Sequence, residues 1–229
     1  AEARGSFIAF LDSDDAWQPW KLDVQMQFFA ARPQLVMCWT DMEAIDPKGQ
    51  SVFPTYLRRM YSAYERVPNG WPFAAVERLG DVLPQASESL RDVRCGSGRI
   101  YSDMLRGNLV HTSTVVLRRD TVREIGWFDE SMRRGGEDFK FHLTTCRLGD
   151  VALLDVPSIR YRVGDDDRIT HPRNSVHFAR SFLRTISDEL HAHHSVIDLP
   201  AREMNRILCE AHQWLAESEL AASHRGSAA

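Results

Sequence analysis

The chain alternates between short apolar runs and segments in which apolar residues recur at helical spacing. The runs are rich in β-branched and aromatic side chains and are bounded by turn residues, which predicts buried strands. They cover residues 7–11, 35–40, 51–53, 110–117, 151–156 and 159–163. Between residues 54 and 107 no clean period emerges, and we expect an insertion with short helices and a loop near residues 95–98.

Helical spacing marks the segments between these runs. Leu22, Met26 and Phe29 share one face of a helix that begins near Pro19, where the first helical turn tolerates the missing N–H. Further helices are expected at residues 120–125, 137–148, 175–192 and 201–222, and Gly149 is expected to act as a C-terminal stop. Strands that alternate with helices predict an α/β domain, in which ligands bind beyond the carboxyl ends of strands.

The last two predicted helices form a tail, residues 173–229, that follows a domain covering residues 1–172. Each helix carries an apolar stripe. The stripes consist of Phe178, Phe182, Leu183 and Ile186 in one helix and of Ile207, Leu208, Ala211, Trp214 and Leu215 in the other. Such stripes must be buried against the domain, against each other or against a second chain, and the last arrangement would give a homodimer.

Composition narrows the classes of function. The 229 residues contain 28 Lys and Arg against 32 Asp and Glu, whereas a dedicated nucleic-acid binder usually shows a basic excess. No apolar run approaches the ~18 residues that a membrane span needs. The four cysteines are too scattered for a metal-type Cys-x-x-Cys pair or a disulfide framework, so free thiols in a reducing cytoplasm are expected.

An acidic cluster follows the first predicted strand. Asp12, Asp14 and Asp15 repel one another, and the alternation of side chains at a strand end puts Asp12 and Asp14 on the same side. Two converging carboxylates are a ready site for Mg²⁺ or Mn²⁺, which keeps open positions for phosphate oxygens. The alternative is a solvated turn in which Asp15 caps the helix that begins near Pro19.

Ordered motifs surround this cluster. Residues 5–15 read Gly-Ser-Phe-Ile-Ala-Phe-Leu-Asp-Ser-Asp-Asp and are followed by Trp17, Pro19 and the pair Lys21-Leu22. Downstream come Gly-Asn at 107–108, a Ser/Thr-rich run at 111–116, Ile-Gly-Trp-Phe-Asp-Glu at 125–130, Gly-Glu-Asp-Phe at 136–139, Val-Pro at 156–157 and Tyr-Arg at 161–162. Over residues 4–163 the sequence therefore resembles the family-2 glycosyltransferases, which have a GT-A fold.

The resemblance implies an inverting transfer of a sugar from a nucleoside-diphosphate sugar to a hydroxyl of a carbohydrate or lipid-linked acceptor, in bacterial polysaccharide or glycoconjugate synthesis. It implies that Asp12 contacts the sugar nucleotide, with Asp15 beside it, and that Asp14 binds the Mn²⁺ or Mg²⁺ on the diphosphate. The metal stabilises the leaving diphosphate as a Lewis acid. The enzyme would work in the cytoplasm or at the inner face of the membrane.

The downstream motifs supply the remaining implied site residues. The resemblance makes Asp138 the general base, and the alternative for Asp138 and its neighbour Glu137 is helix capping. Asn108, His111, Thr112 and Trp127, together with Glu137, are implied substrate contacts, and core packing is the alternative for the first four. A looser match makes His171 a metal ligand, with an exposed loop histidine as the alternative.

One feature of the family is missing. In the family a nucleotide-binding half with two βαβ units precedes the Asp-x-Asp strand, so this chain is expected to match the carboxyl-terminal portion of such an enzyme. A non-catalytic remnant that binds a sugar or a partner is the first alternative. A haloacid-dehalogenase-type phosphatase is the second, although Ala16 stands where that family needs Thr or Val and Lys140 is a poor candidate for its lysine.

Overall fold

The computed structural model describes residues 3–164 and 174–226, which form two compact units. The first unit comprises Ala1–Trp127 and Thr144–Gly164, and the second comprises Phe128–Leu143 and Asp165–Ala229. The second unit thus combines the two C-terminal helices with the segment that carries the Glu-Asp motif. Within the described residues, no helix is both long and apolar enough to cross a membrane.

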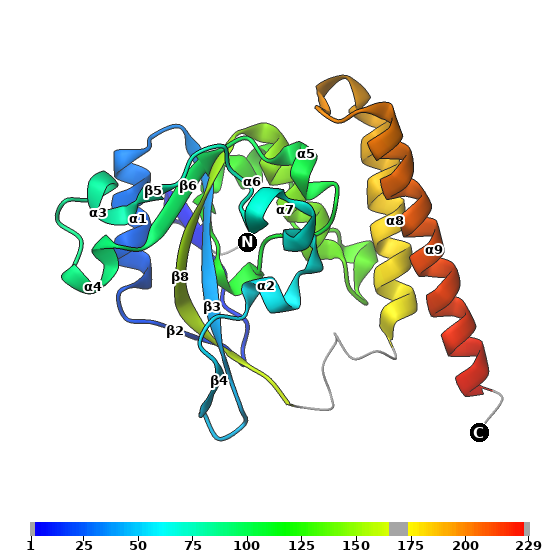
Figure 1. Cartoon of the computed structure of the whole chain (residues 1–229), viewed down its shortest axis with the longest axis horizontal. Coiled ribbons are helices and arrows are strands. Elements are labelled where there is room, and N and C mark those ends of the chain that lie inside the picture. The colour runs from blue at the N-terminus through cyan, green and yellow to red at the C-terminus, as the bar shows by residue number, and fades with distance from the viewer. Residues whose placement is uncertain (1–2, 165–173, 227–229) are drawn as a thin grey trace. The chain divides into compact units, whose positions relative to one another are not determined.

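The first unit is built on a mixed, open sheet (Figure 1). Its strands lie in the order β1-β7-β3-β8-β6-β5, with β2 paired to β8 and β4 paired to β3. Their bounds are β1 Phe7–Ala9, β2 Ala16–Trp17, β3 Leu35–Ile45, β4 Ser51–Phe53, β5 Glu77–Arg78, β6 Arg94–Gly98, β7 Val116–Arg118 and β8 Asp150–Arg162. Strands β3 and β8 are parallel, and the other paired strands are antiparallel. The predicted α/β class is confirmed, and the sheet that underlies it is mixed.

Short helices connect these strands. The α-helices are α1 Lys21–Ala31, α2 Leu57–Met60, α3 Leu79–Val82, α4 Glu88–Arg91, α5 Tyr101–Met104, α6 Arg119–Ile125 and α7 Glu137–Leu148. Single 3₁₀ turns are η1 Ser62–Arg66, η2 Pro68–Gly70, η3 Thr112–Thr114 and η4 Glu130–Met132. The short helices expected between residues 54 and 107 are therefore present.

Helices α1, α3 and α4 cover one face of the sheet (Figure 1). Their apolar side chains form one cluster with Cys38 of β3 and Leu154 of β8. The next residue along β3, Trp39, points to the opposite face, as strand alternation requires, and its Nε1 donates to Tyr64 Oη at 3.3 Å. The helical stripe expected at Leu22 is wrong in one respect: Leu22 is 40% exposed.

The buried face of α1 is instead partly polar. Lys21 and Gln25 are buried beside Val24, Phe28 and Phe29. Lys21 Nζ donates to Gln25 Oε1 at 2.7 Å, and Gln25 Nε2 donates to the backbone carbonyls of Cys38 and Thr114, each at 3.0 Å. Polar residues at core positions look like surface residues in a sequence, so the apolar pattern points to Leu22 where the structure buries Lys21.

The loop expected at residues 95–98 is wrong, because these residues belong to strand β6, which pairs with both β5 and β8. The glycines there serve close packing. A Cβ on Gly96 would lie 2.7 Å from the Trp71 ring and 2.9 Å from the Phe73 ring. Gly149 has a similar role, since a Cβ there would lie 2.6 Å from Val36, and it is not among the positive-φ glycines.

Two other strand predictions need correction. The strand expected at residues 110–117 begins only at Val116 and runs to Arg118, because Thr112–Thr114 forms η3. The two strands expected at 151–156 and 159–163 are one strand, β8, which passes through Pro157. Pro157 lies opposite Asp41, where the β3–β8 register shifts, and a bulge of this kind tolerates the missing N–H.

In the second unit, α8 (Ser175–Ala192) and α9 (Ala201–Gly226) pack side by side, and the 3₁₀ turn η6 (His194–Val196) lies between them in sequence (Figure 1). Phe182 of α8 meets Trp214 of α9 edge to face with ring centroids 5.7 Å apart, and it also contacts Phe139 of α7. The predicted tail helices are confirmed, and their apolar stripes are buried at least partly against each other.

Candidate metal centre

The turn after β1 is fixed by hydrogen bonds to a distant segment of the chain. Asp15 N donates to Asp12 O at 3.2 Å, which closes the turn. Asp12 N donates to Ser113 Oγ at 3.0 Å, and Trp17 Nε1 donates to Ser113 O at 3.1 Å. Ser113 lies in η3, so the departure from strand geometry at residues 112–114 supplies the partners that hold the acidic turn.

Three potential metal ligands meet at this turn. One ligand atom each from Asp12, Asp15 and His111 can be chosen so that all three lie within 4.8 Å of one another. Asp15 Oδ2 lies 3.5 Å from His111 Nε2. The Asp15 side chain is fully buried and the His111 side chain is 10% exposed, whereas Asp12 is exposed as a residue. The group is therefore closed on one side and open to solvent at Asp12.

Aromatic side chains orient the imidazole. His111 Nδ1 lies 3.2 Å from Tyr61 Oη, and the His111 ring meets the Tyr161 ring edge to face at 4.9 Å. Because Tyr61 occupies Nδ1, the other ring nitrogen, Nε2, faces Asp15. A histidine whose second nitrogen is held by a hydrogen bond is the usual arrangement at metal sites.

One carboxylate oxygen of this turn is buried and, in the described part of the chain, unpaired. Among the described residues, Asp15 Oδ1 is buried and has no hydrogen-bond partner. Burial raises the pKa of Asp12 above its ordinary value, and the neighbouring charges of Asp15 and Asp14 raise it further, against opposing effects of His111 and Ser113. Burying an unpaired carboxylate is costly, and a cation bound between Asp12 and Asp15 would remove that cost.

The structure brings together some of the predicted site residues. Asp12, Asp15 and His111 converge, while Asp14 is exposed on the same turn and outside the group of three. Strand alternation cannot place Asp12 and Asp14 together, because β1 ends at Ala9 and the chain turns at Asp12. The turn, and not the strand, decides which carboxylates meet.

The other predicted residues are not part of this group of three. Half-buried Asn108 accepts a hydrogen bond from Val110 N at 3.0 Å, and Thr112 begins η3. Trp127 is 49% exposed. Glu137 and Asp138 are half-buried at the start of α7, in the second unit. His171 lies outside the described residues.

A cavity of about 520 Å³ also lies in the first unit, lined in part by residues from the insertion. At its edge, Asp41 Oδ1 accepts backbone N–H groups of Met42, Tyr56 and Leu57, and burial raises the pKa of this carboxyl. Arg58 Nη1 donates to Asp155 Oδ1 at 2.6 Å.

Several residues that shape the metal centre and the neighbouring cavity were not identified from the sequence. Tyr61 and Arg58 lie in the aperiodic segment, where no pattern distinguishes one aromatic or basic residue from the next. Ser113 was part of an expected strand. Only Tyr161 carried a signal, since it belongs to the Tyr-Arg motif.

Comparisons with known proteins add no assignment: no protein-family model matches the chain, and a search of curated proteins finds no relative.

Proposed function

We propose that this chain is the metal-dependent catalytic portion of an inverting glycosyltransferase with a GT-A-like fold. The observation that carries the proposal is the convergence of Asp12, Asp15 and His111 at a turn after the first strand of an α/β sheet. Ligand sites beyond the carboxyl end of a strand are typical of such sheets. The ordered motifs at residues 5–15 and 107–139 supply the reaction class.

The donor set fits a divalent cation. Two carboxylate oxygens suit Mg²⁺ and Mn²⁺, and the imidazole nitrogen shifts the preference from Mg²⁺ toward Mn²⁺. The buried, unpartnered oxygen of Asp15 is the strongest sign that positive charge belongs there. When bound by Asp12, Asp15 and His111, such a cation would supply Lewis-acid stabilisation to the leaving diphosphate. Asp14, on the same turn, adds negative charge to the site.

The chain's own acid–base chemistry is assigned to Asp138. It would accept the proton of the acceptor hydroxyl while that oxygen bonds to the anomeric carbon and the bond from this carbon to the diphosphate breaks. A solvated aspartate, with a pKa of ~3.9, is a weak base. Attack opposite the leaving group inverts the anomeric centre.

The first test measures metal binding. Titration calorimetry with MnCl₂, followed by nucleoside diphosphates, should show Mn²⁺-dependent binding to the chain. Asp15→Asn keeps the shape of the side chain and should weaken Mn²⁺ binding by roughly 10–100-fold or more, since even outer-shell changes have effects of this size. Asp92→Asn, at a carboxylate whose side chain is 98% exposed, is the matched control. Equal Mn²⁺ affinities for the Asp15→Asn variant and the unaltered chain would refute the metal centre.

The second test measures turnover. Asp138→Asn should lower nucleotide-sugar hydrolysis or transfer by ~10²–10⁴-fold, the usual range for loss of a general base, and should leave binding of the diphosphate intact. Unchanged turnover would remove Asp138 from the mechanism. Metal-dependent binding without any turnover in the unaltered chain would instead favour the non-catalytic alternative.

A further inference from the structure

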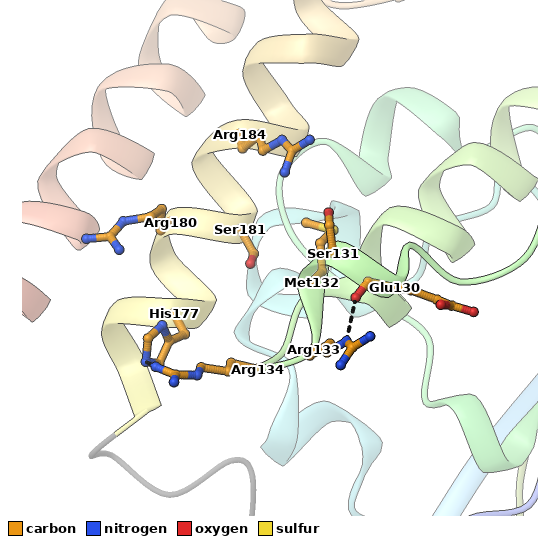
Figure 2. Close-up of a pocket in the computed structure, with 9 residues that line it drawn as sticks. All are labelled: Glu130, Ser131, Met132, Arg133, Arg134, His177, Arg180, Ser181 and Arg184. Carbon is orange, nitrogen blue, oxygen red and sulfur yellow. Dashed lines mark hydrogen bonds between the residues drawn. The ribbon is translucent and has the colours of Figure 1, made fainter.

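A second cavity, also of about 520 Å³, lies wholly within the second unit (Figure 2). One wall is formed by η4 and the residues that follow it, and the other is formed by the first half of α8. The two walls meet through glycines. A Cβ on Gly135 would lie 2.3 Å from the Phe178 ring, and a Cβ on Gly136 would lie 2.6 Å from Ser181. The loop can approach α8 this closely only because both residues lack side chains.

The cavity is strongly basic. Its lining includes Arg133 and Arg134 from the loop and His177, Arg180 and Arg184 from α8, against a single carboxylate, Glu130. On α8 these residues, with Ser181, recur at helical spacing and therefore share one face. The chain as a whole has a formal net charge of -4, so this concentration of positive charge is local and does not follow from composition.

Two of the four arginines that line the cavity pair with a carboxylate, and two do not within the described residues. Arg180 extends toward α9, where Nη2 donates to Glu219 Oε1 at 2.8 Å (Figure 2). Arg184 Nε is 3.9 Å from Asp188 Oδ2, at the limit of an ion pair. Within the described part of the chain, Arg133 and Arg134 form no ion pair.

The two loop arginines are nevertheless held in place. Arg133 Nε donates to Glu130 O at 3.2 Å. Arg134 Nη1 lies 3.1 Å from His177 Nε2, and because a guanidinium has no acceptor, the imidazole nitrogen must accept. Figure 2 shows the Arg134 and His177 side chains directed toward each other across the opening between the loop and α8. The Arg134 guanidinium is therefore fixed beside a neutral imidazole, and its remaining N–H groups are left to bind an anion.

We propose that this cavity binds the phosphate group of a small ligand. Planar guanidinium groups match phosphate oxygens in pairs, and the Ser181 hydroxyl supplies a neutral donor on the same wall. A cavity of this volume lies in the range that holds small organic ligands, so it has room for a diphosphate with an attached group. The phosphate would come from a free phosphorylated molecule or from a lipid headgroup. The inference does not depend on the proposed glycosyltransferase activity.

The test is titration calorimetry of the whole 229-residue chain with inorganic pyrophosphate, in EDTA so that the candidate metal centre does not contribute. The unaltered chain should bind, with an affinity that falls as salt rises. The double variant Arg133→Gln/Arg134→Gln should weaken binding at least ~10-fold, since charge-assisted hydrogen bonds are lost. Arg202→Gln makes the same change in charge at an exposed position of α9 outside the cavity, and it should leave the affinity unchanged.

Two further variants keep the test decisive. Arg184→Gln alters the opposite wall and should also weaken binding. Because it leaves the loop unchanged, misfolding of the loop could not explain its effect. Arg133→Lys/Arg134→Lys keeps the charge but loses the guanidinium fork, so its affinity should lie between those of the unaltered chain and the Gln variant.

A flotation assay distinguishes a lipid headgroup from a free phosphorylated molecule as the source of the phosphate. It uses phosphatidylcholine vesicles with and without phosphatidylglycerol. Vesicle binding that needs phosphatidylglycerol, is lost in Arg133→Gln/Arg134→Gln and is displaced by pyrophosphate indicates a headgroup. Pyrophosphate binding without vesicle binding indicates a free ligand. Absence of both, or an equal loss of affinity in Arg202→Gln, would overturn the proposal.

Discussion

Replacing Lys21 with methionine should change how the stability of the fold depends on pH. Lys21 is fully buried at the start of α1. Its Nζ donates to Gln25 and lies 5.0 Å from the centre of the Trp17 ring, and Trp17 in turn is hydrogen-bonded to Ser113. Burial lowers the pKa of Lys21 from its ordinary value of 10.5 to about 8, against a small opposing effect of Cys38.

The magnitude follows from this pKa. A change from 10.5 to about 8 corresponds to about 3.4 kcal/mol by which burial of the ammonium destabilises the fold at low pH. Between these two values the unfolded chain binds more protons than the folded chain, so the free energy of unfolding rises with pH. From pH 7 to pH 9.5, Lys21 should contribute a rise of about 2 kcal/mol.

Lys21→Met removes this rise. The variant leaves Gln25 Oε1 without its donor, which costs about 1–3 kcal/mol, but this loss does not vary with pH. Urea unfolding followed by tryptophan fluorescence at several pH values should therefore give curves for the unaltered chain and the variant whose separation changes by about 2 kcal/mol across the range. Lys48→Met, at an exposed lysine, should give a curve parallel to that of the unaltered chain.

Parallel curves for the unaltered chain and Lys21→Met would show that Lys21 is solvated, and would refute the burial argument.

Other predictions concern packing, an ion pair and the thiols. Gly96→Ala should destabilise the fold by about 1–3 kcal/mol, because the new Cβ would overlap the Trp71 ring; denaturant midpoints check this. Lys140 and Ser131 hold the pKa of Asp129 well below its usual range, so the stability they provide is present above pH ~4 and lost on acidification below it. Asp129→Asn should flatten acid unfolding over that range, and an unchanged acid profile would contradict the pairing. Of the four free cysteines only Cys209 is exposed, so a thiol reagent should label one site natively and four after denaturation, and Cys209→Ser should abolish the native labelling.

Much of the secondary structure could be read from the sequence alone. Apolar runs located β1, β3, β4 and most of β8, and helical spacing located α1, α6, α7, α8 and α9. The same patterns placed the acidic residues directly after the first strand. These features are local: each depends on the period and composition of a dozen or so neighbouring residues, and tertiary contacts reinforce them.

The partners in the candidate metal centre were decided by the tertiary structure. Asp15 and His111 are 96 positions apart, and no period relates them. The turn that buries Asp15 forms because Ser113 leaves strand geometry and bonds to Asp12 and Trp17. Likewise, the two walls of the basic cavity come from segments that precede and follow β8 in the sequence, and they meet at Gly135 and Gly136. Long-range hydrogen bonds and close backbone approaches select one partner among many chemically similar residues, and that selection requires the positions of both partners in space.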